Sequence, residues 1–331
     1  MLGETCLAVR VDASTPGARL RLIDAVEGTA QDLRDWRQRK FFAGSQVVLV
    51  LGTAERQIIT IDRPDVQDDE LQQAVRWPLA EAMELEAEEL LTTAQPLPPI
   101  NAALRPQLLA IAARVAVARA HIATLKSAGI ALRSIDIVDS ALRGMALLQG
   151  SDNNGSVVLA FVGGDICIGL LWHGEFCALR TLALPVRVPR DSGEFEEQLA
   201  LHIQRTTDHF ERQATQLAVR HVLASMPSLG DATRESVRSA LPLAPRMFEL
   251  DAHFDMSGVT RERCEGHNEL SALACVAAAR LIDAGHWDAS ANAPPAQDAA
   301  ASIAAHAVAS ASARSASDNG MRTEPHLVDV E

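Results

Sequence analysis

The stretch Gly155-Ser-Val-Val-Leu-Ala-Phe-Val-Gly-Gly-Asp-Ile-Cys-Ile-Gly-Leu-Leu-Trp172 decides the fold of this chain. Apolar and β-branched residues run up to a pair of glycines and Asp165 and then resume, which predicts two β-strands joined by a tight turn. The run from Val157 to Val162 is apolar at every position, which is typical of a strand covered on both faces of its sheet. We therefore expect this hairpin to open a second, sheet-centred lobe.

The hairpin also bears on function. In several nucleotide-binding folds, a strand of this kind carries a carboxylate into a phosphate site just before a glycine-rich turn. Here the three residues before Gly163 and Gly164 are Ala160, Phe161 and Val162. The carboxylate that would organise a metal and phosphate is therefore missing from this strand.

The totals limit the class of protein. A chain of 331 residues is long enough for two compact lobes. The net charge of -13 disfavours a nucleic-acid partner, because binding to phosphates relies on clustered Lys and Arg. The chain has no apolar window near the roughly 20 residues of a membrane span and no signal peptide, so we expect a cytoplasmic protein. Its five cysteines are odd in number and contain no CxxC pair, which favours buried thiols over a zinc site or a disulfide framework.

Residues 1–150 are expected to form the first lobe, with a small α/β subdomain inserted at about residues 46–113. Apolar runs predict strands at 6–11, 20–26, 46–51, 57–61, 107–113 and 130–137. Helices are predicted at 31–42, with Thr29 as N-cap, at 116–128 and at 139–148.

The inserted subdomain is strongly acidic. After Pro64 we expect a helix whose first turn carries Asp65, Asp68, Asp69 and Glu70, where carboxylates favour the positive end of the helix dipole. Leu71, Ala74, Val75 and Leu79 recur at helical spacing and predict its buried face. A second acidic segment contains Glu81, Glu84, Glu86, Glu88 and Glu89. Since no Asp-x-Asp-x-Asp-Gly loop is present, we interpret this segment as a solvated rim and not as a metal site.

The second lobe is expected to span residues 151–287. After the hairpin, strands are predicted at 176–184, 221–224 and 246–250, and helices at 194–215, 232–241 and 268–284. His202 and His209 lie on the long helix, but no third metal ligand is within reach in sequence, so we expect no metal site. Residues 288–331 are rich in Ala and Ser and poor in large apolar residues, and we expect them to be disordered.

Several segments resemble one family. They are Asp68-Asp-Glu-Leu-Gln-Gln-Ala-Val-Arg-Trp77 with Gln95-Pro-Leu-Pro98, Ser127-Ala-Gly-Ile-Ala-Leu-Arg-Ser-Ile-Asp-Ile137 with Ala141-Leu-Arg143, and Leu201-His-Ile-Gln-Arg-Thr-Thr-Asp-His-Phe210. Their order resembles the family of the MSHA pilus biogenesis protein MshI and the type IV pilus assembly protein PilM, over residues 5–285. The resemblance implies an actin-like (ribonuclease H-like) two-lobed α/β fold with an inserted subdomain.

The resemblance also implies a role and a partner. Proteins of this family are scaffolds at the cytoplasmic face of an inner-membrane pilus assembly platform. The implied partner is the cytoplasmic N-terminal segment of a single-pass inner-membrane protein of the PilN or MshJ kind, so that membrane association comes through partners only. Arg76 and Trp77 form an Arg–Trp pair of the kind that anchors interfaces. Packing of Trp77 into the subdomain core is the alternative.

The resemblance places the residues of a nucleotide site on positions that have changed. The first metal-organising acid falls at Arg10, the second at Phe161, and the adenosine-admitting glycine pair at Ser225 and Met226. These changes imply degenerate phosphate loops, no catalytic residues, no cofactor and no ATPase activity.

Two alternatives stay open. One is an actin-like ATPase in which Asp12 replaces the missing acid at Arg10, and Asp165, directly after Gly163 and Gly164, replaces the missing acid at Phe161. The other is a cytoplasmic component of a type II secretion platform, which has a related fold.

Overall fold

The computed structural model describes residues 6–13, 19–39, 45–100, 105–150, 155–162, 164–183, 193–213, 217–225, 230–241, 243–259 and 268–287. Residues 1–292 form one compact unit and residues 293–331 another. The predicted disordered tail, residues 288–331, lies outside the described residues. No helix within the described ranges is long and apolar enough to cross a membrane.

The first sheet contains the N-terminal strands. Strand β1 (Cys6–Asp12) pairs antiparallel with β2 (Leu20–Gly28), as predicted, and β13 (Phe254–Asp255) adds to β2 in parallel. Strands β3 (Val48–Leu51) and β7 (Ser134–Ile137) form a separate parallel pair. Helix α1 (Ala30–Arg39) follows the predicted cap, because the Thr29 backbone N–H donates to Asp32 Oδ2 at 2.7 Å.

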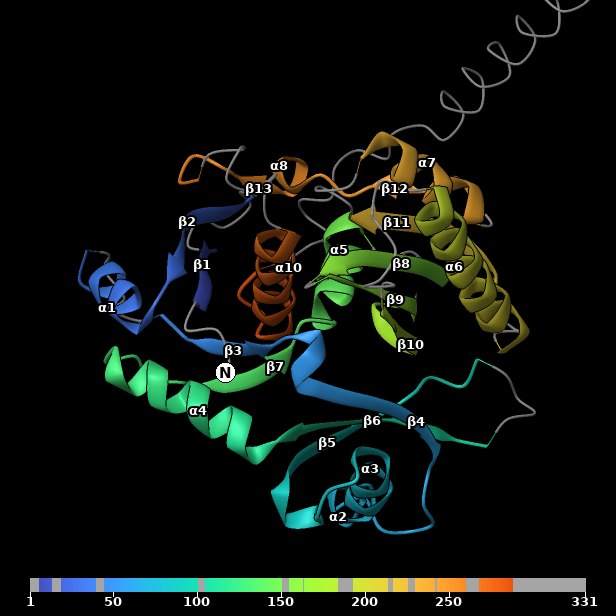
Figure 1. Cartoon of the computed structure of the whole chain (residues 1–331), viewed down its shortest axis with the longest axis horizontal. Coiled ribbons are helices and arrows are strands. Elements are labelled where there is room, and N and C mark those ends of the chain that lie inside the picture. Colours follow the sequence, from blue (N-terminus) through green and yellow to red (C-terminus); the bar gives the residue numbers. More distant parts are fainter. Residues whose placement is uncertain are drawn as a thin grey trace, which may run out of the picture. The chain divides into compact units, whose positions relative to one another are not determined.

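The inserted subdomain is a three-stranded antiparallel sheet with short helices on one face (Figure 1). The sheet order is β4 (Arg56–Asp62), β6 (Gln107–Arg114), β5 (Leu90–Pro96). Helices α2 (Leu71–Ala74) and α3 (Arg76–Met83) and the 3-10 turns η1 (Thr53–Glu55) and η2 (Ala87–Glu89) complete it. Leu71, Val75 and Leu79 of the predicted stripe are buried. Strand β3, which lies inside the predicted span of 46–113, pairs with β7 instead of with this sheet.

Two predictions in this subdomain were wrong. Asp65, Asp68, Asp69 and Glu70 do not form the first turn of the predicted helix. Helix α2 begins only at Leu71, and residues 65–70 form bends and turns. In that loop Arg63 forms an ion pair with Asp68. Strand β5 is not among the strands that the sequence predicted.

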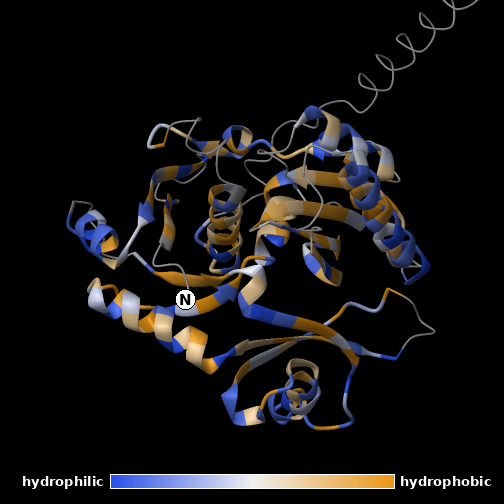
Figure 2. Cartoon of the chain, viewed as in Figure 1, coloured by the Kyte–Doolittle hydropathy of each residue, from blue (hydrophilic) through white to orange (hydrophobic). Residues whose placement is uncertain are grey.

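The second sheet is built around the predicted hairpin. Its order is β10 (Glu175–Ala183), β9 (Asp165–Trp172), β8 (Gly155–Val162), β11 (Val219–Ser225), β12 (Arg246–Met247). Helix α6 (Gly193–Gln213) packs on one face of this sheet and contacts α7 (Asp231–Ala240). Alternate β8 residues enter two different cores: Val157 and Phe161 pack with α6, and Val158 packs with helices on the other face. The prediction that this strand is covered on both faces is confirmed, and Figure 2 shows its apolar colour.

Those other helices are α5 (Ser140–Gln149) and α10 (Asn268–Asp283), which pack against each other. Gly144 allows the close approach, since a Cβ built on it would lie 2.0 Å from the Cys275 carbonyl oxygen. Helix α10 also contacts β1, so the last part of the predicted second lobe packs against the first sheet. Helices α4 (Val115–Ser127) and α8 (Leu250–His253) complete the described elements.

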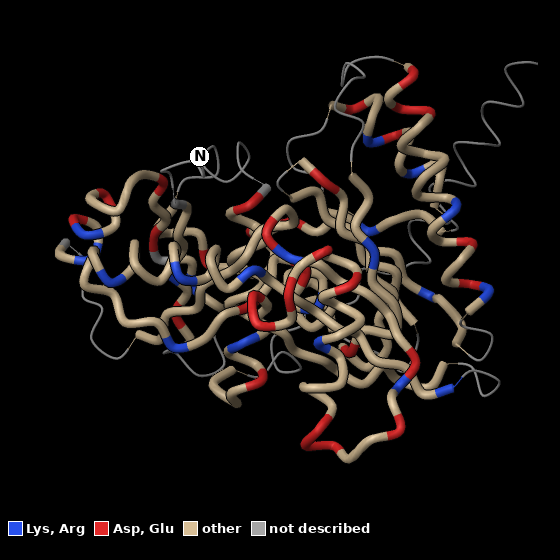
Figure 3. The backbone as a smooth tube through the Cα atoms, turned by 60° about the horizontal axis from the view of Figure 1, so that its bottom comes forward, with Lys and Arg blue, Asp and Glu red and all other residues tan. Residues whose placement is uncertain are grey.

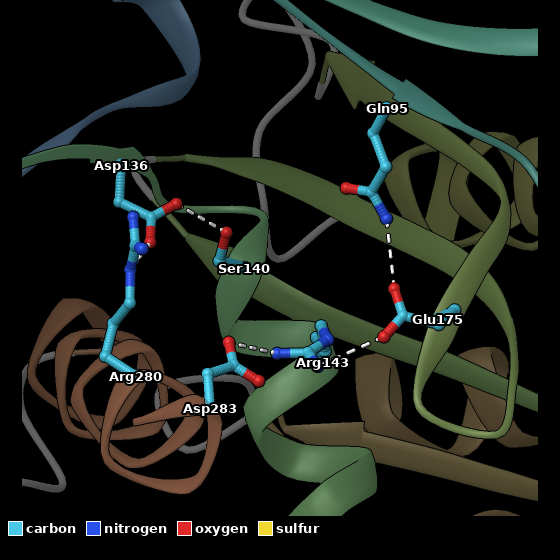
Figure 4. A network of polar contacts seen from close by, with 7 residues as sticks. All are labelled: Gln95, Asp136, Ser140, Arg143, Glu175, Arg280 and Asp283. Atoms are coloured by element: carbon cyan, nitrogen blue, oxygen red, sulfur yellow. Dashed lines mark hydrogen bonds and ion pairs between the residues drawn. The ribbon is translucent and has the colours of Figure 1, made fainter. Parts of the chain in front are cut away.

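A chain of polar contacts connects the inserted subdomain to this helix pair (Figure 4). Gln95 Nε2 on β5 donates to Glu175 Oε2 at 3.1 Å, and Arg143 Nη2 on α5 donates to Glu175 Oε1 at 3.2 Å. Arg143 Nη1 reaches Asp283 Oδ2 on α10 at 2.7 Å. The contacts therefore link β5, β10, α5 and α10.

Candidate partner-binding site

Trp77 extends into solvent from the first turn of α3. It is 65% exposed, whereas Val75 and Leu79, two residues before and after it, are fully buried. Two residues correspond to about 200° around an α-helix, so burial of that stripe turns Trp77 to the opposite face. The structure therefore leaves Trp77 on the surface and does not pack it into the subdomain core.

A groove of about 700 Å³ opens beside Trp77, between α3 and η2. Its shape comes from a reversal of the chain after α3, where Glu84 adopts a left-handed conformation (φ +52°). The Leu85 N–H donates to the Ala80 carbonyl oxygen at 3.1 Å and closes the helix end. The other residues that line the groove are Pro78, Glu81, Glu86, Ala87 and Glu89.

The groove is acidic. Four glutamates line it together with Trp77, none of the lining residues is Lys or Arg, and all four glutamates are exposed. In Figure 3, which brings the bottom of Figure 1 forward, red acidic segments gather in this subdomain. The predicted solvated rim is confirmed, and it surrounds the exposed indole.

This arrangement has a definite binding chemistry. Exposed carboxylates individually contribute little in water, but several of one sign attract an oppositely charged segment and raise its association rate. The Trp77 ring offers a large apolar surface and a face that attracts Lys and Arg side chains. The groove therefore suits a segment that combines basic and apolar residues.

Arg76, the predicted companion of Trp77, does not line the groove. The two residues are consecutive on α3, so their side chains leave the helix about 100° apart. The Arg76 Nε atom is buried and has no hydrogen-bond partner among the described residues. The structure therefore does not bring Arg76 and Trp77 together on one surface.

The predicted phosphate-loop residues lie in two different sheets. Arg10 and Asp12 are on β1, and both line a cavity of about 500 Å³ between β1 and β3. Two other polar groups at that cavity have protein partners: Arg280 Nε donates to Asp136 Oδ2 at 2.6 Å, and His121 Nε2 lies 2.6 Å from Glu55 Oε1. The cavity therefore presents mainly apolar strand and helix residues.

The hairpin residues of the predicted phosphate loop lie in the second sheet. Phe161 is 3% exposed and packs in the core beneath α6. Gly164 has a φ of +89° in the turn, and Asp165 pairs with Val162 at the start of β9. Gly163 lies outside the described residues. Phe161 is therefore a core residue and does not face a ligand.

Ser225, at the position of the family's glycine pair, is buried at the end of β11, and Met226 lies outside the described residues. Within the described ranges, no group of three or more His, Cys, Asp or Glu residues is placed to hold a metal ion. Cys167, Cys177 and Cys275 are free and buried, as predicted. Burial raises their thiol pKa values, that of Cys177 to about 12, so these thiols stay protonated at neutral pH.

One buried ion pair between distant parts of the chain was not predicted from the sequence. Arg56, at the start of β4, donates from Nε to Asp139 Oδ2 at 2.8 Å and from Nη2 to Asp139 Oδ1 at 2.7 Å. It also donates from Nη2 to Thr181 Oγ1 on β10 at 2.5 Å. The partners are 83 and 125 residues away in sequence, and no local pattern indicates such a pair.

Comparison with known proteins identifies the fold. No family model matches the chain, and no curated protein matches it in sequence. The chain has an actin-like α/β fold, as predicted. It is similar to a chain of the PilM-PilN type IV pilus biogenesis complex, with a TM-score of 0.60 and 17% identity over 84% of this chain and 95% of that one.

Two further structures align less closely. One is the cytoplasmic domain of EpsL, an inner-membrane component of the type II secretion system of Vibrio cholerae, with 11% identity, a TM-score of 0.44 and coverage of 82% of this chain and 94% of that one. The other is a Bacteroides thetaiotaomicron protein with an actin-like ATPase fold and unknown function, with 8% identity, a TM-score of 0.44 and coverage of 82% and 95%. At these identities the similarities concern the fold alone.

Proposed function

We propose that this protein is a non-catalytic cytoplasmic scaffold of a type IV pilus assembly platform, of the MSHA kind. In this proposal it binds the cytoplasmic N-terminal segment of a single-pass inner-membrane protein of the PilN or MshJ kind. The observation that carries the proposal is the exposed Trp77 above an acidic groove. Similarity in fold to a chain of the PilM-PilN complex supports the platform role.

The charge of the groove supports the choice of partner. Cytoplasmic segments that flank membrane spans are enriched in Lys and Arg. Four exposed glutamates around Trp77 would attract such a segment, and an apolar residue of the segment would pack on the indole. In this proposal, binding at this groove holds the scaffold at the inner face of the membrane.

The non-catalytic part of the proposal is supported by the two changed positions. Arg10 cannot ligate Mg²⁺, because a guanidinium offers donors and no acceptor. Phe161 has no polar side-chain atom and is buried in the core. Asp12 and Asp165, the carboxylates that the alternative ATPase hypothesis assigns to the site, lie at the end of β1 and at the start of β9.

The test is a calorimetric titration of the protein with the N-terminal cytoplasmic peptide of a PilN-like inner-membrane protein. Trp77→Ala should weaken binding by about 2 kcal/mol, which is roughly 30-fold in Kd, because an aromatic anchor is lost. The control is Leu201→Ala, which removes an exposed apolar residue (45% exposed) from α6. Circular dichroism of each variant checks folding.

The outcome of that titration is decisive. Equal weakening by Trp77→Ala and Leu201→Ala, or unchanged affinity in a folded Trp77→Ala protein, would remove this groove from the interface. If the wild-type protein does not bind the peptide, the platform proposal is wrong in its present form.

A further inference from the structure

Strands β4 and β10 are edge strands of two different sheets. Strand β4 is the last strand in the order β4-β6-β5, and β10 is the last strand in the order β10-β9-β8-β11-β12. Among the described residues, neither strand has a strand partner on its outer side. An edge strand presents backbone N–H and C=O groups along that side, which another extended segment can pair with.

These two edges face each other across a groove of about 700 Å³, which we call the β4–β10 groove. Residues 56–60 of β4 line one wall and residues 177–182 of β10 line the other, and His209 and Phe210 of α6 contribute a third. Arg56 holds the two walls together through its hydrogen bond to Thr181 Oγ1. Figure 1 shows β4 below β10.

The polar character of this groove is opposite to that of the groove beside Trp77. No Asp or Glu is among its lining residues, although the whole chain carries a net charge of -13. Arg180 is exposed on the β10 wall, whereas Arg56 is already paired with the buried Asp139. The β4–β10 groove therefore has an available cation and no carboxylate.

The pKa of His209 also reflects the positive charge near this groove. Its pKa is lowered, first by burial and then by the positive charges of Arg180 and Arg212. The imidazole is consequently neutral at pH 7, and Arg180 supplies the charge on this wall. An incoming carboxylate would offset that positive field.

We propose that the β4–β10 groove binds an extended, acidic segment of a partner protein, which adds as a strand between β4 and β10. The outer edges of β4 and β10 supply backbone hydrogen bonds on both sides of the segment, and Arg180 selects for Asp or Glu side chains. Such a segment would join the inserted subdomain's sheet to the five-stranded sheet. This second site is independent of Trp77, and its ligand has the opposite charge to that of the proposed pilus partner.

The probe is a fluorescein-labelled peptide, Asp-Val-Glu-Val-Asp-Val-Glu, titrated into the full-length protein by fluorescence anisotropy. One control peptide replaces every acid by Lys, and another is N-methylated at alternate residues so that it cannot pair along both edges. We expect saturable binding of the acidic peptide alone, weakened at least about fivefold by Arg180→Glu. The matched control variant is Arg220→Glu, which makes the same charge change on β11 outside the groove.

Hydrogen–deuterium exchange then locates the bound peptide. The acidic peptide should slow exchange of backbone amides in residues 57–60 and 178–182, because both edges become hydrogen-bonded. Absence of binding, equal binding of the Lys or N-methylated peptide, equal weakening by Arg180→Glu and Arg220→Glu, or protection elsewhere without these two segments would each overturn the proposal. Trp77→Ala should leave this binding unchanged.

Discussion

Arg56 connects three elements, because it lies on β4 and donates hydrogen bonds to Asp139 at the start of α5 and to Thr181 on β10. Its side chain is 6% exposed and that of its partner Asp139 is 0% exposed. A buried ion pair contributes little net stability compared with an apolar pair of the same shape, but removing one partner leaves an uncompensated buried charge. The pair therefore fixes where β4 sits against β10 and the start of α5.

A substitution at this pair gives the prediction at the scale of one residue. Arg56→Met should lower the free energy of unfolding by about 3–5 kcal/mol, because Asp139 stays buried without its partner. Adding Asp139→Asn should recover part of the loss, since an amide is cheaper to bury than a charge. Urea denaturation measures both.

The matched control is Arg63→Met. Arg63 pairs with Asp68, whose side chain is 88% exposed, and surface pairs of this kind contribute about 0–1 kcal/mol. A similar, small loss in Arg56→Met and Arg63→Met would show that the Arg56 pair does not hold the structure together.

Single residues also show what the sequence could predict about the candidate site. Trp77 could be selected from the sequence because Trp and Arg are common anchors at interfaces, but its exposure depends on which helix face is buried. Arg76 was grouped with Trp77 because they are neighbours in sequence. The helix separates them, since a step of about 100° turns adjacent side chains to different surfaces.

At the scale of elements, the contact between α5 and α10 depends on small residues. A side chain at Gly144 would collide with the backbone of Cys275, which no rotamer change can relieve. Both helices present mostly small or apolar residues to the shared core, among them Ala141, Ala274 and Ala278. This close packing fixes the helix pair that covers one face of the five-stranded sheet.

Gly144→Ala should therefore destabilise the protein by about 1–3 kcal/mol, because the helices must separate or bend to admit the methyl group. Gly193→Ala at the start of α6 is the control, since a Cβ there meets nothing within 4 Å. That change should leave stability unchanged or raise it by about 0.4–1 kcal/mol. Thermal unfolding would contradict the account if both alanine variants shifted stability in the same direction and by the same amount.

The elements that the sequence predicted were those with a long, local pattern. The hairpin and the long helix predicted at 194–215 have such patterns, and both were found close to their predicted positions. Strand β13 has only two residues and pairs with β2, which lies more than 200 residues earlier, so no local periodicity predicts it. The predicted strands at 130–137 and 246–250 are shorter in the structure, because only residues 134–137 and 246–247 find strand partners.

At the scale of the whole molecule, the actin-like fold positions two grooves of opposite charge, one within the inserted subdomain and the other between that subdomain and the five-stranded sheet. The groove beside Trp77 is lined by four glutamates, and the β4–β10 groove is lined by no carboxylate. The fold followed from the order of strands and helices along the chain. The grooves did not, because each depends on turns and strand edges that bring separate segments together.

Hydrogen–deuterium exchange of the full-length protein, with and without the PilN-like peptide and in parallel with ATP-Mg²⁺, tests the central claim most directly. The account predicts that the peptide slows exchange in residues 77–89, around α3 and η2, and that ATP-Mg²⁺ changes exchange nowhere. Protection of β1 and of the turn between β8 and β9 by ATP-Mg²⁺, with no protection of residues 77–89 by the peptide, would contradict it.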